Sequence, residues 1–319
     1  MAGRRVLITG VGSHVGSLLA ARLERDPDVE YVAGLDTRRP KVPLEHTEFM
    51  DADIRDPQLA QLIPPTGVDT IVHEQIVRQP GPGMSSRAMH DINVIGTLQL
   101  LAACERVPTL STIVVRGSAG VYGAEPQAPQ FFDEEMSRLF PLRTRFQRDV
   151  AEIENYFGTY SRRHGGVSCT MLRYQPAIGP GMRTQITRYL SQPVCPIYMG
   201  FDPRIQLVHI DDALEAIVAA VRNPVPGAVN VAGPGTIGLT RMIRRAGKRA
   251  LPIAAPLFGA VTSTGQRLGL DTQSEDFQRL LRYGRGVDTR RLTDEVGYTP
   301  RHSTVDAVED WAGYARAAA

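Results

Sequence analysis

Three glycines near the N-terminus have the spacing of a phosphate-binding loop. They lie in Thr9-Gly-Val-Gly-Ser-His-Val-Gly16, directly after an apolar run and directly before a helical pattern. Such a loop lets backbone N–H groups and a helix N-terminus approach a pyrophosphate without interference from Cβ atoms. Twenty residues after Gly16, Asp36 ends a second apolar run, where a carboxylate can accept both ribose hydroxyls of an adenosine. Together these features predict a dinucleotide site.

The acid at position 36 also indicates which dinucleotide is bound. A carboxylate there repels a 2′-phosphate, so NAD is favoured over NADP. Arg38 and Arg39 follow closely and could receive that phosphate, which keeps NADP as the alternative.

The elements that must position this site alternate along the first half of the chain. Short apolar runs are separated by longer stretches with helical spacing, which is typical of β-α-β units and a parallel sheet. The pattern predicts an α/β fold with a doubly wound parallel sheet (Rossmann) in residues 1–180 and a smaller substrate lobe in residues 181–319, with segments crossing back to the sheet. Six strand candidates lie at 5–9, 31–35, 48–50, 70–73, 111–116 and 167–173.

Composition excludes several classes of protein. The 319 residues are 42% hydrophobic and carry a net charge of +2, so no excess of basic charge points to nucleic acid. Three separated cysteines suggest neither disulfides nor a metal site, and a reducing cytoplasm is expected. No signal peptide is evident, and the longest uncharged run, 250–266, is broken by prolines and glycines and too short to span a membrane. The basic residues are 34 arginines and only two lysines, Lys41 and Lys248.

Motifs along nearly the whole chain resemble the extended short-chain dehydrogenase/reductase superfamily, in particular its NAD-dependent epimerase/dehydratase group, which includes nucleotide-sugar epimerases. The motifs are Thr9-Gly10 to Gly16, Asp36, Asp53-Ile54, Ile71-Val-His73, Ile92-Asn-Val-Ile-Gly-Thr97, Ser118-Ala-Gly-Val-Tyr-Gly123, Leu172-Arg-Tyr174, Val208-His-Ile-Asp-Asp212, Val229-Asn-Val-Ala-Gly233 and Gly297-Tyr-Thr-Pro-Arg301. They are specific for the superfamily and not for a substrate.

The resemblance implies a role for each matching position. It makes Gly10, Gly12 and Gly16, with Ser13, His14 and Val15 between them, the pyrophosphate loop. Asp36 becomes the ribose acceptor, Asp53 and Ile54 the adenine contacts, and Asn93 and Tyr174 part of the cofactor site. Ser118 becomes the hydroxyl that hydrogen-bonds the reacting oxygen; as a residue at the end of a strand it could equally cap the following turn.

Two small departures from the family pattern lie near the cofactor site. Ser13 occupies the position of the middle glycine, with Gly12 just before it, and the polar pair Glu74-Gln75 replaces two small apolar residues. The polar pair would either crowd the cofactor or supply new chemistry.

The larger departure concerns catalysis. The family uses Tyr-x-x-x-Lys, in which the ammonium lowers the pKa of the phenol and holds the nicotinamide ribose. Thr37 precedes Lys41 by four residues and Arg244 precedes Lys248, so the pair is absent. Ala151-Glu152 matches a small-acidic pair of the family. This match predicts that Thr144 and Arg148 occupy the positions of the family's Tyr and Lys, with Arg148 holding the ribose. Other registers offer Phe146 with Val150, or Tyr160 with His164.

Replacement groups and phosphate ligands are nominated from strand ends and from the second lobe. His73, Glu74 and Tyr122 could act as acids or bases, although each also has a structural interpretation: backbone bonding, pairing with Arg116, and packing. The candidate ligands for a nucleotide diphosphate are Arg183, Arg188 and Arg204. His209-Ile-Asp211-Asp212 begins a helix and is interpreted as structural.

Three functions remain open. The first is an NAD-linked oxidoreductase that interconverts ketone and alcohol on a nucleotide sugar or similar small polar metabolite, with a non-standard proton donor. The others are an inactive NAD-binding sensor or regulatory protein, and a non-redox lyase or cyclase. The resemblance suggests a homodimer formed through the helices at 88–106 and 144–163. Composition and cysteine spacing lead us to expect a cytoplasmic protein with no nucleic-acid, membrane or metal partner.

Overall fold

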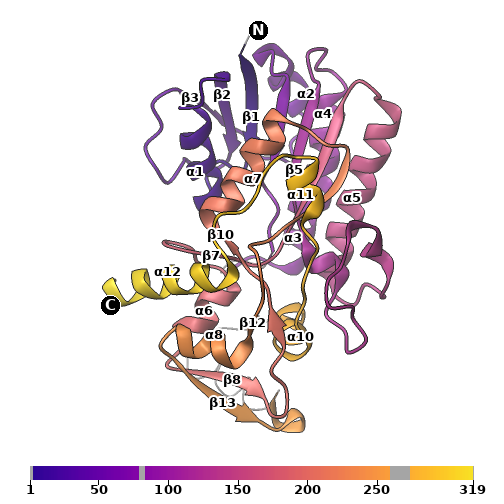
Figure 1. Cartoon of the computed structure of the whole chain (residues 1–319). Helices are drawn as coiled ribbons and strands as arrows, with labels where there is room; N and C mark the ends of the chain where they lie inside the picture. The colour runs from indigo at the N-terminus through magenta and orange to yellow at the C-terminus, as the bar shows by residue number, and fades with distance from the viewer. Residues whose placement is uncertain (1–2, 79–82, 259–273, 319) are drawn as a thin grey trace.

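The computed structural model describes residues 3–78, 83–258 and 274–318 (Figure 1). Its centre is a parallel sheet of seven strands in the order β11-β6-β5-β4-β1-β2-β3. The strands are β1 (Arg4–Thr9), β2 (Val29–Asp36), β3 (Thr47–Asp51), β4 (Thr70–His73), β5 (Thr112–Ser118), β6 (Ser168–Tyr174) and β11 (Gly227–Val231). The predicted doubly wound α/β fold is confirmed.

Both faces of this sheet are covered by helices, as its apolar strands require. Val6 and Ile8 face α1 (His14–Leu23) and α7 (Ile210–Arg222), whereas Leu7 belongs to the core on the opposite face. That opposite face packs against helices α2 (Leu59–Leu62), α4 (Gly96–Cys104) and α5 (Arg145–Arg163). Shorter elements on the connections are η1 (Pro64–Thr66), α3 (Ser86–His90), η2 (Asp91–Ile95), η3 (Ala119–Tyr122) and η4 (Glu134–Arg138).

The seventh strand comes from the second half of the chain, where the alternation of strands and helices is lost. β11 pairs with β6 in parallel register, with Val229 opposite Leu172. The preceding helix α7 also packs on the sheet, so residues 210–231 complete the Rossmann layer. The six-strand prediction missed β11 because its five residues stand among prolines and glycines.

The remaining elements form a lobe at the carboxyl ends of the strands (Figure 1). Its own core includes Tyr189, Ile197, Phe277 and Trp311. The elements are β7 (Ala177–Ile178), α6 (Gln185–Ser191), β8 (Val194–Tyr198), β9 (Arg204–Ile205), β10 (Val208–His209), β12 (Ile237–Gly238), α8 (Leu239–Arg245), β13 (Arg249–Ile253), α10 (Glu275–Tyr283) and α12 (Thr304–Ala317). Helix α11 (Arg290–Asp294) packs instead on β11, where Leu292 belongs to the core of the sheet.

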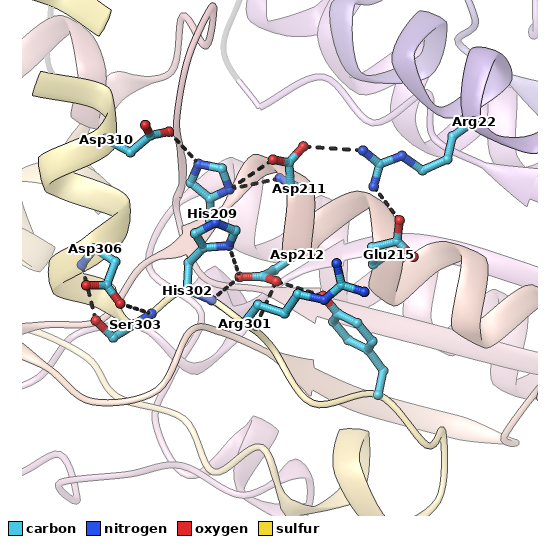
Figure 2. A network of polar contacts seen from close by, with 11 residues as sticks. Arg22, His209, Asp211, Asp212, Glu215, Arg301, His302, Ser303, Asp306 and Asp310 are labelled. Carbon is cyan, nitrogen blue, oxygen red and sulfur yellow. Dashed lines mark hydrogen bonds and ion pairs between the residues drawn. The ribbon is translucent and has the colours of Figure 1, made fainter. Parts of the chain in front are cut away.

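Asp212 connects the C-terminal segment to α7 (Figure 2). Its buried carboxylate accepts hydrogen bonds from the Tyr298 hydroxyl at 2.7 Å and from the backbone N–H groups of Arg301 at 2.8 Å and His302 at 2.9 Å. These bonds lower the pKa of Asp212 against the effect of its burial. Asp212 therefore has the structural role predicted for this motif.

The imidazoles of His209 and His302 stack beside this carboxylate, with ring centroids 4.0 Å apart (Figure 2). His209 Nε2 lies 3.0 Å from Asp310 Oδ2, and His302 Nδ1 lies 3.0 Å from Asp212 Oδ2. Together with Asp211, the two histidines bring possible ligand atoms within 4.8 Å of one another. Since each histidine already has a carboxylate partner through one ring nitrogen, we interpret the cluster as a connection between α7, the C-terminal segment and α12.

Within the described ranges, no helix has the length and apolar character needed to cross a bilayer. Residues 259–266 of the long uncharged run lie outside those ranges.

Candidate functional site

The glycine loop joins β1 to α1 in a conformation that explains its composition. Gly10 has φ +79°, which other residues rarely adopt, and a Cβ on Gly12 would lie 2.2 Å from the Arg38 carbonyl oxygen. Ser13 is the N-cap of α1, and its Oγ accepts the N–H of Gly16 at 2.9 Å. Ser13 thus replaces the expected glycine with a helix cap and leaves the turn intact.

Asp36 lies at the end of β2 next to this loop and is 1% exposed. Its Oδ2 accepts the N–H of Gly12 at 3.1 Å, and its Oδ1 accepts the N–H of Arg38 at 3.0 Å. The Arg38 side chain is 71% exposed, with Nε 3.8 Å from Asp36 Oδ1. The backbone therefore orients the carboxylate, and each carboxylate oxygen keeps lone-pair capacity for ribose hydroxyls.

Two residues assigned to adenine lie on the connection after β3. Asp53 pairs with Arg55, whose Nη2 is 2.5 Å from Asp53 Oδ2, and this pairing lowers the pKa of Asp53. Ile54 is fully buried, and a Cβ on Gly96 would lie 2.6 Å from its Cγ2. Ile54 therefore acts in this structure as a core residue between the connection and α4.

Asn93 and Tyr174 also have internal partners. The Asn93 amide donates to the Val77 carbonyl and accepts the Val77 N–H, both at 2.8 Å. The Tyr174 hydroxyl donates to the Ala213 carbonyl at 2.9 Å, and burial raises the pKa of this phenol. Asn93 thus positions the segment after β4, and Tyr174 anchors α7 to the sheet.

A cavity of about 630 Å³ opens between the sheet and the lobe. It extends from the glycine loop, at Ser13, His14 and Val15, to Ser118 at the end of β5. From the lobe it is lined by α6 and by α10, including Asp276 and Phe277. His14 contacts Gly181 in this wall, and its pKa is lowered by burial and by the nearby Lys41. The predicted cofactor loop and the predicted catalytic serine thus border one continuous space.

Ser118 caps the turn that follows β5. It is the N-cap of η3, and its Oγ accepts the N–H of Gly120 at 3.1 Å. The capping interpretation of this serine is therefore confirmed. Its catalytic role stays a prediction, and the capping bond is compatible with it, because an oxygen that accepts one bond keeps its own hydrogen for a ligand.

The start of α5 determines which side chains reach the cavity. Thr144 is the N-cap, with a capping box to Gln147, and precedes the first helical turn. Arg148 points to solvent, where its Nη1 donates to the Arg143 carbonyl at 3.0 Å. Phe146 lines the cavity, and a Cβ on Gly120 would lie 3.6 Å from its ring and 3.1 Å from Ser118 Oγ. Phe146 therefore lies on the cavity wall with Ser118, whereas its partner Val150 is buried in the core with Ala119 and Val121.

The third candidate pair, Tyr160 with His164, lies at the C-terminal end of α5. The ring of Tyr160 stacks on that of His164 with centroids 4.3 Å apart, and the tyrosine is buried in the sheet core. Neither belongs to the described cavity wall.

The three nominated acids and bases lie behind the cavity wall. His73 is fully buried between the hydroxyls of Thr9, at 2.8 Å, and Thr97, at 3.0 Å, and burial lowers its pKa to about 4. Glu74 is buried against Arg116, with 2.7 Å between Oε1 and Nη1. Burial raises the pKa of Glu74, and Arg116 opposes that shift.

Tyr122 is likewise held by protein groups. Its hydroxyl donates to Asn230 Oδ1 at 2.7 Å and accepts from Arg173 Nη1 at 2.9 Å. Its ring stacks on Phe132 with centroids 4.9 Å apart, and burial raises its pKa to about 12. These contacts correspond to the packing interpretation of Tyr122.

Asp276, which the sequence analysis did not single out, supplies the carboxylate of the cavity wall among the described residues. It lies in the first turn of α10, and its Oδ2 accepts the Thr144 hydroxyl at 2.7 Å. Burial raises its pKa, while the bond from Thr144 and the charge of Arg285 oppose that shift. No local motif marks this residue, because its place depends on how α10 meets α5.

Cations dominate the same wall. Of the nominated phosphate ligands, Arg183 and Arg188 line the cavity, whereas Arg204 borders a separate pocket beside Arg282. The wall also carries Lys41, Arg78, Arg116 and Arg285. Among the described lining residues, six cationic side chains therefore share the wall with one carboxylate, that of Asp276.

Known proteins match both the sequence and the geometry. The family model described as "NAD dependent epimerase/dehydratase family" matches residues 6–232. The uncharacterized protein Rv0501 of Mycobacterium tuberculosis is 35% identical over 313 residues, covering 96% of this chain and 82% of that protein.

Solved structures share the fold. The UDP-glucuronic acid 4-epimerase of Bacillus cereus, in complex with NAD, superposes with a TM-score of 0.74 at 18% identity, covering 98% of this chain and 96% of that one. The dTDP-glucose 4,6-dehydratase of Bacillus anthracis, also with NAD, gives a TM-score of 0.73 at 16% identity, covering 99% and 97%. With the glycine loop, the seven-stranded sheet and the match over residues 6–232, the chain belongs to the NAD-dependent epimerase/dehydratase family.

Proposed function

We propose that this protein binds NAD and a nucleotide sugar, and that it interconverts an alcohol and a ketone on the sugar without the Tyr-x-x-x-Lys pair of its family. One observation carries the proposal: the loop Gly10–Gly16 and Ser118 border a single cavity of about 630 Å³. A cofactor held by the loop and a substrate held at Ser118 would therefore share one space.

The described residues fit the adenosine and pyrophosphate portions of NAD. The glycine turn leaves backbone N–H groups uncovered by Cβ atoms, and the N-terminus of α1 favours an anion. Asp36 would hold the adenosine ribose. Bound NAD supplies reversible hydride acceptance, and the protein must then orient the substrate and exchange the hydroxyl proton.

Ser118 and Asp276 would perform that exchange. The Ser118 hydroxyl can donate to the reacting oxygen, which stabilises negative charge as it develops. Asp276 can accept or return a proton, since it is a carboxyl on the cavity wall whose pKa burial raises above the ordinary value. Arg183 and Arg188 line the lobe side, where they would face the nucleotide diphosphate.

A direct assay tests this proposal. Purified protein is titrated with NAD by calorimetry and then incubated with UDP-glucose and UDP-glucuronic acid while reduced nicotinamide is followed by absorbance and products are separated by chromatography. We expect turnover in wild type, a loss of roughly 10²-fold or more in Ser118→Ala, and NAD affinity unchanged by that substitution. Failure of NAD to bind refutes the proposal.

The phenylalanine at position 146 favours a second candidate function, NAD binding without turnover. A phenyl ring on the cavity wall beside Ser118 cannot exchange a proton. Tight NAD binding with no product from any tested nucleotide sugar, and identical behaviour of wild type and Ser118→Ala, would select this sensor function.

We also propose that the protein forms a homodimer through α4 and α5. Ile95 and Leu98, 40% and 39% exposed, form an apolar pair at the start of α4 that a second copy could cover. Light scattering should give twice the chain mass for wild type and the chain mass for Leu98→Asp. A monomeric wild type would refute the dimer.

A further inference from the structure

Three arginines surround Ser118 at the inner end of the cavity. Arg116 precedes Ser118 by two residues on β5, so both side chains project from the same face of the sheet. Arg78 donates to the Gly117 carbonyl at 3.3 Å, and Arg285 donates to the Gly123 carbonyl at 3.2 Å. Arg78 lies on the segment after β4, Arg116 on β5 and Arg285 on the segment after α10, and all three line the cavity.

The partners of these arginines only partly neutralise them. Arg116 pairs with Glu74 at 2.7 Å. Among the described residues, no carboxylate lies within ion-pairing distance of Arg78 or Arg285; the Arg285 Nε instead donates to Gln175 Oε1 at 3.3 Å. Asp276 acts on Arg285 only through its charge.

The inner end of the cavity carries more positive than negative charge. Among the described residues, three guanidiniums face two carboxylates, Glu74 and Asp276, which leaves one formal positive charge at the inner end. Arg285 is only 8% exposed, and a buried cation without an anionic partner is costly. Burial lowers the pKa of Arg78 to about 9 and that of Arg285 to about 10, as expected for guanidiniums short of counter-charge.

We propose that the sugar recognised at Ser118 carries a carboxylate, which Arg78 and Arg285 bind. This inference rests on the proposed function and narrows its substrate class from nucleotide sugars in general to those with an acidic sugar. A guanidinium binds a carboxylate through two parallel hydrogen bonds. One carboxylate neutralises the remaining charge, whereas a doubly charged phosphate would exceed it.

The test compares two ligands that differ only at the proposed contact. UDP-glucuronic acid carries a carboxylate where UDP-glucose carries a hydroxymethyl group. With NAD present, calorimetry should show at least tenfold tighter binding of UDP-glucuronic acid, the effect expected of one charge-assisted contact. Arg78→Gln should reduce this preference to less than threefold and leave the affinity for UDP-glucose nearly unchanged, and Arg78→Lys should restore part of it.

Arg285→Gln is the second variant, and circular dichroism establishes whether it folds. If Arg285→Gln does not fold, Arg78→Gln alone provides the test. We expect Arg78→Gln to fold, because Arg78 makes a single hydrogen bond within the described structure. Arg290→Gln is the matched control, since that side chain is 83% exposed and its one ion pair among the described residues is with Asp288. It should keep the full preference.

Equal affinity of wild type for the two ligands overturns the inference and leaves the proposed function standing. A preference that survives in both Arg78→Gln and Arg285→Gln overturns it as well. If neither nucleotide sugar binds, the proposed function fails, and a thermal shift with glucuronate against glucose decides the carboxylate site alone. Stabilisation of wild type but not of Arg78→Gln by glucuronate would support the site, and no stabilisation of wild type would reject it.

Discussion

Thr144 Oγ1 donates a hydrogen bond of 2.7 Å to Asp276 Oδ2, which joins the start of α5 to the first turn of α10 across 132 residues of sequence. The same hydroxyl oxygen accepts the Gln147 N–H at 3.2 Å. We expect Thr144→Ala to lower the free energy of unfolding by about 1 kcal/mol through loss of the cap. Thr144→Ser keeps the hydroxyl and should match wild type. Urea denaturation measures both, and equal stability of the alanine and serine variants would contradict the capping role.

A gain-of-function variant can test which residue of α5 takes the position of the family's catalytic tyrosine. Its ring borders the cavity beside Ser118, so Phe146→Tyr would introduce a phenol where a proton can be exchanged. We expect turnover on UDP-sugars to rise by about tenfold or more. Thr144→Tyr combined with Arg148→Lys should give no rise, because Arg148 points to solvent. A rise in that pair and none in Phe146→Tyr would establish the other register.

Asp36 should control cofactor affinity and choice. Asp36→Ala removes the acceptor for the ribose hydroxyls and the acceptor for the Gly12 N–H, so we expect NAD affinity to fall roughly 10- to 100-fold. NADP affinity should rise relative to that of NAD, since the repulsion is gone and Arg38 is nearby. Calorimetry with both dinucleotides checks this. An unchanged ratio of the two affinities would exclude Asp36 from the ribose site.

His73 predicts a pH dependence of stability. Its pKa is lowered to about 4 in the folded protein, against about 6.5 in the unfolded chain, so the unfolded state binds the proton more tightly. The neutral imidazole's contribution is complete above pH 6.5 and is lost as the pH falls toward 4, by about 3 kcal/mol over the window.

The variant His73→Gln isolates this contribution, because it can still hydrogen-bond Thr9 or Thr97 and does not titrate. Urea denaturation between pH 4 and 7 should give a steeper pH dependence for wild type than for the variant. Parallel curves would mean that His73 does not titrate with unfolding.

Asp212 should be essential for holding the C-terminal segment. Asp212→Ala leaves the part-buried N–H groups of Arg301 and His302 without their acceptor, so we expect a loss of roughly 2 kcal/mol and faster proteolysis beyond Tyr298. The neighbouring Asp211→Asn is the control, because Asp211 is 55% exposed and its ion pair with Arg22 contributes little. Equal sensitivity of the two variants to protease would rule out the specific role.

The fold could be predicted from the sequence alone, and so could the local features of the expected cofactor loop. A glycine turn, a helix cap and a strand-end carboxylate are local features, and their spacing has a physical meaning before any packing is known. The absence of Tyr-x-x-x-Lys also follows from the sequence alone, since neither lysine has a tyrosine four residues before it. The strand β11 was missed because pairing with β6, rather than its own pattern, defines it.

Only the tertiary structure decided which side chains share the cavity. The face of α5 that meets the sheet is set by the burial of Val150, Ile153 and Phe157, and this packing turns Arg148 to solvent and Phe146 inward. Asp276 and Arg285 line the same cavity as Ser118, although they lie more than 150 residues away in the sequence, because the lobe lies over the carboxyl ends of the strands. No local pattern carries such contacts, since they arise from the packing of distant elements.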